Sequence, residues 1–305
     1  MQSLCVIGSL NTDLVATVGS LPRPGQTLTG SAFHTFPGGK GANQAVALGR
    51  LGADVAMVGK VGDDAYGRTY LEVLAREHVK SDGVAVEPGV SSGIAIIEVD
   101  ASGENSIVII PGANGTVDAA FLDGRQDRML RCDIFLLQLE IPMAATLHAL
   151  RLLRNAGKTV ILDPAPAMTL SDELLALPDI LTPNETELEA LAGTRADGPE
   201  DLPRVAGALL DRGAKSVVVK AGKHGAVLVR REGILNVPGF AVNAVDTTAA
   251  GDSFNAGLAY SLARGALLPE AVRFANAVGA LSTTALGAQA AMPGLPAVER
   301  LLAAG

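Results

Sequence analysis

The sequence contains no tryptophan, and aromatic residues make up only 3% of its 305 residues. Hydrophobic residues still reach 48%, so the core must be packed mainly by alanine, valine and leucine. Such a composition excludes a disordered chain. The length is near the upper limit of what one hydrophobic core supports, so we expect a single domain over 1–305 with at most a small appendage.

Positive charge is scarce as well. The chain has 24 Lys and Arg against 32 Asp and Glu, which gives a net charge of -8. Nucleic acids and anionic membranes both favour clustered cations, so we expect neither as a partner. No run reaches the roughly 18 apolar residues that a membrane span needs, and the first ten residues lack the cationic start of a secretory signal. These absences favour a cytoplasmic protein that acts on a small molecule.

Cysteine is limited to Cys5 and Cys132, each of which lies in an apolar, strand-like run. Buried free thiols are the ordinary interpretation of such positions, and they indicate a reducing compartment. The four histidines are far apart and show no zinc-binding spacing.

Short apolar runs of strand length alternate with segments of helical spacing through most of the chain. Continuous apolar strands are typical of a parallel sheet that is buried on both faces. The alternation predicts βαβ units, and hence a doubly wound, mostly parallel α/β sheet flanked by helices. The expected strands are 3–9, 54–59, 133–138, 159–163, 179–183 and 216–220, and the expected helices are 41–52, 64–78, 143–157 and 201–213.

Two stretches break this alternation, at about 12–36 and 92–110. Both consist of alternating strands joined by turn residues, which is the pattern of a β-hairpin. Such hairpins do not fit easily into a parallel core. We expect them to form a small separate β-sheet that serves as a lid or a dimer surface.

The segment DTTAAGD, residues 246–252, directly precedes a segment with apolar residues at helical spacing that ends at Gly265. We expect Asp252 in the first turn of an amphipathic helix. Almost no side chain covers Ala249, Ala250 and Gly251, so their amides and the helix N-terminus can bind an anion. Asp252 beside that anion hole suits a general base for phosphoryl transfer. The alternative is an aspartate that only complements the helix dipole.

Asp246 is too distant in sequence to share a helix face with Asp252. A carboxylate beside a loop with free carbonyl groups can hold a cation, which would brace the anion-hole loop.

Two further segments carry polar residues at a predicted helix start. In 36–59, glycine pairs surround Lys40 and precede Asn43, an arrangement that suits a hydroxyl-rich ligand or, alternatively, a glycine-rich turn capped by Asn43. In 180–191, Asn184 and Glu187 have the spacing of a capping box. They also follow a buried strand, where α/β sheets bind ligands, so both interpretations stay open.

At these residues the sequence resembles the ribokinases of the PfkB carbohydrate kinase family. The similarity runs over nearly the whole chain, through GSLNTD, PRPGQTLTG, FPGGKGANQAVALGRLGA, IIPGAN, LLQLE, DPAPA, LTPNETE, VDTTAAGDSFNAGLA and GAQAAMP. It implies a ribokinase-like fold and an ATP-dependent, Mg²⁺-assisted phosphorylation of the ribose 5-hydroxyl.

The resemblance also implies roles for individual residues. Asp252 is the catalytic base, with Ala249, Ala250 and Gly251 as the anion hole, and Asp13 contacts ring hydroxyls. Glu187 orients Mg²⁺ through water. The implied sugar site comprises Asn11, Asp13, Gly39, Lys40, Gly41, Asn43, Glu140 and Asp252. The implied nucleotide site comprises Asn184, Glu187, Lys220, Gly222, Gly225, Gly251 and Asn276.

An activating monovalent cation, usually K⁺, is implied near Asp246 by the same resemblance. Its further ligands would be the carbonyl groups of Thr248, Ser282, Ala285 and Gly287. The chain has Ala291 where ribokinases often carry a serine hydroxyl, so one ligand is missing. The inserted strands are implied to form the lid and a homodimer contact.

The substrate is less closely defined than the reaction. A nucleoside kinase would stack its base on aromatic residues of the lid, which offers only Phe33 and Phe36, so ribose fits better. Deoxyribose, fructose or a phosphohexose remain alternatives, as does a sugar-binding regulator without catalysis. Asp252, the anion hole and the Asn184/Glu187 pair favour the enzyme, because a binder needs none of them.

Overall fold

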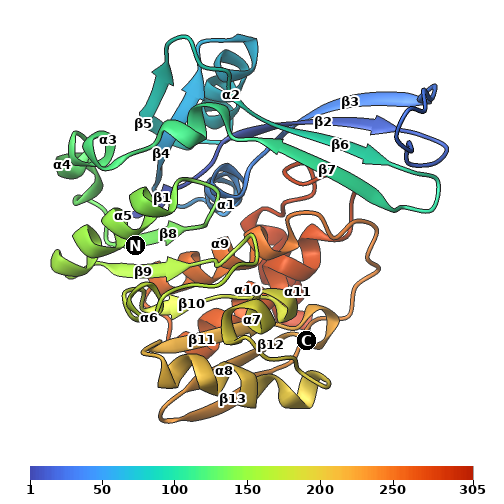
Figure 1. The fold of residues 1–305 in the computed structure, drawn as a ribbon. Helices are drawn as coiled ribbons and strands as arrows, with labels where there is room; N and C mark the ends of the chain where they lie inside the picture. The colour runs from blue at the N-terminus through green and yellow to red at the C-terminus, as the bar shows by residue number, and fades with distance from the viewer. Residues whose placement is uncertain (305) are drawn as a thin grey trace.

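The computed structural model describes residues 1–304 and has a nine-stranded sheet at its centre (Figure 1). The strand order is β13-β12-β11-β10-β9-β8-β1-β4-β5. All pairs from β11 to β5 are parallel, whereas β12 pairs antiparallel with both β11 and β13. The strands are β1 (Leu4–Ile7), β4 (Val55–Gly62), β5 (Lys80–Glu87), β8 (Ile134–Leu137), β9 (Thr159–Leu162), β10 (Ile180–Leu181), β11 (Ser216–Lys220), β12 (Ala226–Arg230) and β13 (Gly233–Val237).

Helices cover both faces of this sheet, because alternate residues of its strands point to opposite sides. Leu4 and Val6 belong to one core cluster, and Cys5 and Ile7 belong to the other. The first face carries α1 (Lys40–Arg50), α2 (Ala65–Arg76), α9 (Ala250–Ala263), α10 (Leu268–Ser282) and α11 (Leu295–Ala304). The second carries α3 (Ala119–Asp123), α4 (Gln126–Met129), α5 (Met143–Asn155), α6 (Asp172–Ala176), α7 (Glu185–Ala192) and α8 (Leu202–Asp211).

The predicted doubly wound α/β fold is therefore confirmed, and each of the six predicted core strands is present. Helices α5 and α8 are followed by Gly157 and Gly213 with φ of 65° and 107°, the left-handed conformation that ends a helix at glycine. Strands β5, β12 and β13 are not among the predicted strands. Both cysteines are buried and free, as predicted.

The predicted amphipathic character of the helix after residue 249 is wrong. Nearly every residue of α9 is buried, on all sides of the helix. It packs against α1, α10 and β8. Small residues such as Ala256, Gly257 and Ala259 let these neighbours approach closely: a Cβ at Gly257 would lie 2.8 Å from a side-chain atom of Val278. A helix that is covered all round needs no polar face.

Both predicted insertions contribute to a second, four-stranded sheet with the order β3-β2-β6-β7. Its strands are β2 (Asn11–Thr17), β3 (Ala32–Gly38), β6 (Gly93–Val99) and β7 (Asn105–Ile110). The β2–β3 and β6–β7 pairs are antiparallel hairpins, and β2 pairs with β6 in parallel. Figure 1 shows this small sheet, here named the lid sheet, extending away from the main body.

Within residues 1–304, none of the helices has the length and the apolar character needed to cross a bilayer.

Candidate active site

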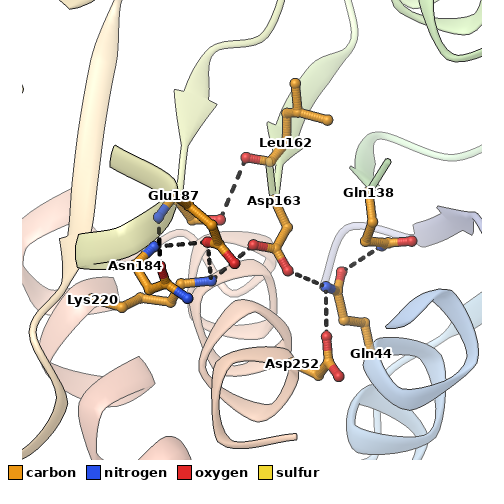
Figure 2. Close-up of polar contacts among 9 residues, drawn as sticks. Gln44, Gln138, Leu162, Asp163, Asn184, Glu187, Lys220 and Asp252 are labelled. Carbon is orange, nitrogen blue, oxygen red and sulfur yellow. Dashed lines mark hydrogen bonds and ion pairs between the residues drawn. The ribbon is translucent and has the colours of Figure 1, made fainter. Parts of the chain in front are cut away.

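Polar side chains from four neighbouring strands gather at one edge of the main sheet (Figure 2). Gln138 follows β8, Asp163 follows β9, Asn184 follows β10, and Lys220 ends β11. The carboxyl ends of parallel strands are where open α/β sheets bind ligands. Helices α1 and α9 add Gln44 and Asp252 to the same place (Figure 2).

Asp252 lies in the first turn of α9 and is only 5% exposed. Its Oδ2 accepts a hydrogen bond from Asn43 Nδ2 at 3.0 Å, and its Oδ1 accepts one from Gln44 Nε2 at 3.1 Å. Both donors come from α1. The alternative in which Asn43 caps α1 is wrong, because Gly39 is the N-cap residue and Asn43 lies inside the helix. The site thus uses the asparagine to orient Asp252.

Burial raises the pKa of Asp252 to about 6. The ammonium group of Lys40 opposes this shift, whereas the charge of Asp163 adds to it. A carboxylate with this pKa is ionised at neutral pH and is a stronger base than an ordinary aspartate. Its environment therefore suits proton abstraction, which the helix-dipole alternative does not require.

The N-terminus of α9 offers backbone N–H groups to an anion. Ala249 is the N-cap residue and has the left-handed φ of 59°. The amide of Ala250 donates to the Thr247 carbonyl oxygen at 3.2 Å. In the part of the chain that the structure describes, the amides of Gly251 and Asp252 have no such partner outside the helix. The amide of Ala250 is therefore not free for the predicted anion hole, whereas the amides of Gly251 and Asp252, together with the helix dipole, suit an anion beside Asp252.

The other end of the site is formed by the start of the lid sheet. Asn11 is 4% exposed, and its Oδ1 accepts from Asn114 Nδ2 at 2.7 Å. The Asp13 carboxylate lies so close to Gly38 that a Cβ there would be 2.3 Å from one of its oxygens. Glycine at this position is required by the close approach of the carboxylate.

Glu140 connects this end to the first helix. Its Oε2 accepts from the backbone N of Lys40 at 3.0 Å and from the Ser9 hydroxyl. Gly39 has a φ of 87°, and a Cβ on Gly41 would lie 2.7 Å from the backbone of Gly8. Both glycines of the predicted sugar loop are thus required by the backbone.

Two charged groups at the sugar end have altered pKa values. Burial raises the pKa of Asp13 to about 7, and the charges of Glu140 and Asp252 add to the effect. Burial alone would lower the pKa of Lys40, but Asp252, together with further carboxylates of the site, raises it above its ordinary value. Lys40 therefore remains a cation among several carboxylates, and Asp13 titrates near neutrality.

On the nucleotide side, Asn184 and Glu187 form the predicted capping box of α7. The Asn184 side chain accepts from Glu187 N at 2.8 Å, and Glu187 Oε2 accepts from Asn184 N at 2.8 Å. Glu187 also lies 3.8 Å from Lys220 Nζ. The capping and ligand-site interpretations are compatible, because the capped carboxylate still faces the charged edge of the sheet (Figure 2).

The remaining predicted nucleotide residues frame this side. Gly222 and Gly225 have left-handed φ values of 53° and 94°, and a Cβ on Gly225 would lie 2.2 Å from the Val237 carbonyl oxygen. Asn276 donates to the carbonyl oxygens of Val237 and Pro238 at 3.0 and 3.1 Å. Its amide group therefore holds the end of β13 against α10.

The loop of Asp246 lies next to the loop that follows α10. Asp246 accepts from the backbone N of Thr248 at 2.9 Å and from that of Gly287 at 2.8 Å. The Ser282 hydroxyl donates to the Gly279 carbonyl oxygen at 2.8 Å. Hydrogen bonds hold the pKa of Asp246 below its ordinary value although burial acts in the opposite direction. The structure thus brings Asp246, Thr248 and Gly287 together, and an ionised carboxylate there fits a cation.

Four residues of this site have no predicted role. Gln44 and Asp163 bond directly to the network around the base, Gln138 bonds to Gln44, and Asn114 bonds to Asn11. A signal was available for two of them: Gln138 and Asp163 are each the last residue of a predicted buried strand, at the edge where such sheets bind ligands. Gln44 gave no signal, because its partners are distant in sequence.

A comparison with known protein families identifies the family of this chain. Residues 1–295 match the family described as pfkB family carbohydrate kinase. The chain belongs to the pfkB carbohydrate kinase family. Within that family it is 41% identical to a ribokinase from Bacillus subtilis over 302 residues, which covers 99% of this chain and all of the relative. It is 36% identical to a deoxyribokinase from Salmonella typhi, with 96% of each chain covered.

Solved structures of family members agree with this pfkB assignment. An Arabidopsis thaliana ribokinase, described as complexed with ribose and ATP, superposes with a TM-score of 0.93 at 34% identity. The match covers 99% of this chain and 98% of the plant chain. The predicted ribokinase-like fold and the predicted family are both confirmed.

Proposed function

We propose that this pfkB-family chain is an ATP-dependent ribokinase, which transfers the γ-phosphoryl group of ATP to the 5-hydroxyl of ribose. The observation that carries the proposal is the buried carboxylate of Asp252 at the N-terminus of α9, beside free backbone amides. The near-full-length ribokinase relatives support ribose as the acceptor.

In the proposed reaction the sugar hydroxyl gives its proton to the Asp252 carboxylate as its oxygen attacks the γ-phosphorus. The new O–P bond forms while the bond from the γ-phosphorus to the bridging oxygen of ADP breaks, so ADP leaves with that electron pair. The amides of Gly251 and Asp252 face the phosphoryl oxygens, where charge accumulates. Asn43 and Gln44 keep both carboxylate oxygens oriented toward α1.

Sugar binding is assigned to the opposite end of the site. Asp13 and Asn11 at the start of the lid sheet accept hydrogen bonds from ring hydroxyls, and Glu140, Lys40 and the glycines before it complete the surface. Asp13 is fixed by its close contact with Gly38. An ionised carboxylate is a strong acceptor for hydroxyl groups.

Mg²⁺ would be held through water by Glu187. Oxygen donors suit this ion, which keeps several waters in proteins, and no group of three His, Cys, Asp or Glu within the described residues forms a dedicated metal cage. When bound, the ion neutralises phosphate charge. Asn184 positions Glu187 through the capping box, and Lys220, Gly222, Gly225 and Asn276 border the nucleotide.

A K⁺ ion between the loops 246–248 and 282–287, and a homodimer formed through the lid sheet, complete the proposal. Asp246 joins those loops, and the carbonyl groups of Thr248, Ser282, Ala285 and Gly287 would complete the ligand set, with none from the methyl group of Ala291.

Exposed apolar residues on the face of the lid sheet opposite Asp13 support the dimer. They include Ile96, Val108 and Ile110 at 45%, 57% and 37% exposure.

Deoxyribose is the second candidate acceptor, because a deoxyribokinase is also a near-full-length relative. The test is ATP consumption by the purified protein with Mg²⁺ and K⁺ against ribose, deoxyribose, fructose, fructose 6-phosphate and adenosine, ranked by kcat/KM. We expect ribose to lead. A ranking led by another acceptor would change the substrate, and no consumption with any of them would refute a kinase acting on these acceptors.

A further inference from the structure

Gln44 is a fully buried side chain that touches two carboxylates with one nitrogen. Its Nε2 donates to Asp252 Oδ1 and to Asp163 Oδ2, both at 3.1 Å (Figure 2). An amide nitrogen carries two hydrogens, so both are used. The structure therefore places the two carboxylates on one shared donor, with no second donor left for a ligand.

The orientation of this amide is fixed by Gln138. Gln138 Nε2 donates to Gln44 Oε1 at 2.7 Å. The reversed amide would place an oxygen between two carboxylates and would bring two nitrogens together, so both contacts would be repulsive. Gln138 lies directly after β8, and the main sheet thus determines which atom of Gln44 faces the base (Figure 2).

Asp163 continues the connection to the phosphate side. Its Oδ1 accepts from Lys220 Nζ at 2.8 Å, and both side chains are nearly buried, at 2% and 12% exposure. Lys220 Nζ also lies 3.3 Å from the position that a Cβ on Gly251 would occupy. The ammonium group therefore borders the anion hole, and one unbroken chain of contacts joins it to the base.

The electrostatic surroundings explain why such a connection has an effect. Two buried carboxylates that face each other repel, and a shared donor offsets that repulsion. Gln44 favours the ionised form of Asp252, and Asp163 disfavours it. The charges of Lys40 and Asp13 also act on Asp252. The further charged groups around Lys40 and Asp163 are Glu140 after β8, Glu187 of α7 and Lys220 of β11.

We propose that Gln44 is a positioning residue for phosphoryl transfer, which ties the base Asp252 to the Asp163–Lys220 ion pair beside the anion hole. It touches neither the sugar nor the nucleotide. By holding the two carboxylates on one amide, it keeps the proton acceptor and the cation near the phosphoryl site at a fixed separation. The inference rests on the proposed kinase function.

The experiment compares Gln44→Met with the wild type. Methionine has a similar length and volume but cannot donate. We expect kcat to fall about tenfold or more, as for a lost positioning contact, while calorimetric sugar affinity stays within about threefold. The acid limb of the kcat–pH profile should move to higher pH, because the ionised base has lost a donor beside a like charge.

Asp163→Asn tests the same connection and should shift the acid limb of the kcat–pH profile in the opposite direction. Because asparagine has nearly the same shape as aspartate, this variant also serves as the test if Gln44→Met folds poorly. Removal of the like charge should move the acid limb of kcat to lower pH. In the double variant Gln44→Met/Asp163→Asn the limb should return toward its wild-type position. Unshifted limbs in both single variants, or a raised sugar KM with unchanged kcat in Gln44→Met, would overturn the proposal. A wild-type protein without kinase activity would instead refute the proposed function.

Discussion

The two sheets of this molecule expose their apolar side chains very differently. In β1 of the main sheet Leu4, Val6 and Ile7 are fully buried, whereas in β7 of the lid sheet Ile107 and Val108 are 51% and 57% exposed. Helices cover both faces of the main sheet, whereas within residues 1–304 nothing covers β7. The main sheet can therefore hold side chains at fixed separations, while the lid sheet retains surface for a ligand or a second subunit.

The candidate active site lies where these two regions meet, and each region contributes one carboxylate with a raised pKa. Asp252 is surrounded by the main body and has fixed donors on both oxygens. Asp13 is the third residue of β2 in the lid sheet and packs against Gly38, the glycine that ends β3. From this contrast we expect the chemical step to depend on the main body and much of the sugar affinity to depend on the lid sheet.

The largest effect is expected for Asp252→Asn. The substitution removes the base and its charge, so kcat should fall by about a thousandfold or more. Sugar affinity, measured by calorimetry, should change only a few-fold. Ser253→Ala is the matched control: that hydroxyl is buried on the same helix and has no hydrogen-bond partner among the described residues 1–304, so kcat should stay near the wild-type value. Turnover of Asp252→Asn near the wild-type rate would remove Asp252 from its role.

Asp13→Asn should affect sugar binding rather than the chemical step. Loss of a charged acceptor for ring hydroxyls should raise the sugar KM by about 10- to 100-fold, while kcat changes far less. Steady-state kinetics with ribose separates the two constants. Glu98→Gln, a carboxylate change on a neighbouring lid strand, serves as control and should leave both near wild type. An Asp13→Asn variant with unchanged KM and a greatly lowered kcat would reverse the assignment.

Sequence motifs predicted those features of this site that are formed by residues close together in the sequence. The small residues before Asp252 predicted an anion hole at a helix start, and the spacing of Asn184 and Glu187 predicted a capping box. Both features follow from residues only a few positions apart. Asp252 and the Asn184–Glu187 pair lie together at the strand ends of the main sheet (Figure 2).

Contacts between distant segments could not be predicted in the same way. Asparagine is a residue type that often caps helices, yet the side chain of Asn43 donates a hydrogen bond to Asp252, 209 positions away in the sequence. Gln44 and Asp163 are linked across 119 positions. The burial of α9 on all sides likewise depends on α10 and α1 packing around it. Each of these features arises from tertiary packing, which overrides a local pattern.

The pH dependence of kcat/KM should show both carboxylates of the free enzyme. Asp13 has a pKa of about 7 and Asp252 a pKa of about 6, and both act in the ionised form. Activity should therefore fall as the pH drops through 7, by about tenfold per pH unit once one group titrates fully. In Asp13→Asn the limb should move to about pH 6. A wild-type acid limb near pH 4, as for ordinary aspartates, would contradict the raised pKa values of both Asp13 and Asp252.

Substitutions at two adjacent residues of β7 distinguish the functions of the two faces of the lid sheet. Ile109 pairs in register with Ala95, which pairs with Asp13, so these three share the sugar-facing side; Val108 points to the other side. Ile109→Ser should raise the sugar KM about fivefold through lost apolar contact. Val108→Ser should leave KM unchanged but weaken dimerisation, measured by sedimentation. Equal effects of both variants on KM would contradict the assigned faces.

The smallest effect concerns the anion hole itself. Ala249 holds the left-handed φ of 59°, which costs an L-residue roughly 1 kcal/mol and glycine nothing. Glycine also loses more entropy on folding, so Ala249→Gly should raise the free energy of unfolding by only about 0.5 kcal/mol. Ala250→Gly, one position later and helical, should instead lower it by about 1 kcal/mol. Urea denaturation of both variants measures the difference. A destabilised Ala249→Gly variant would mean that the packing of this methyl group against the core outweighs the strain in the backbone.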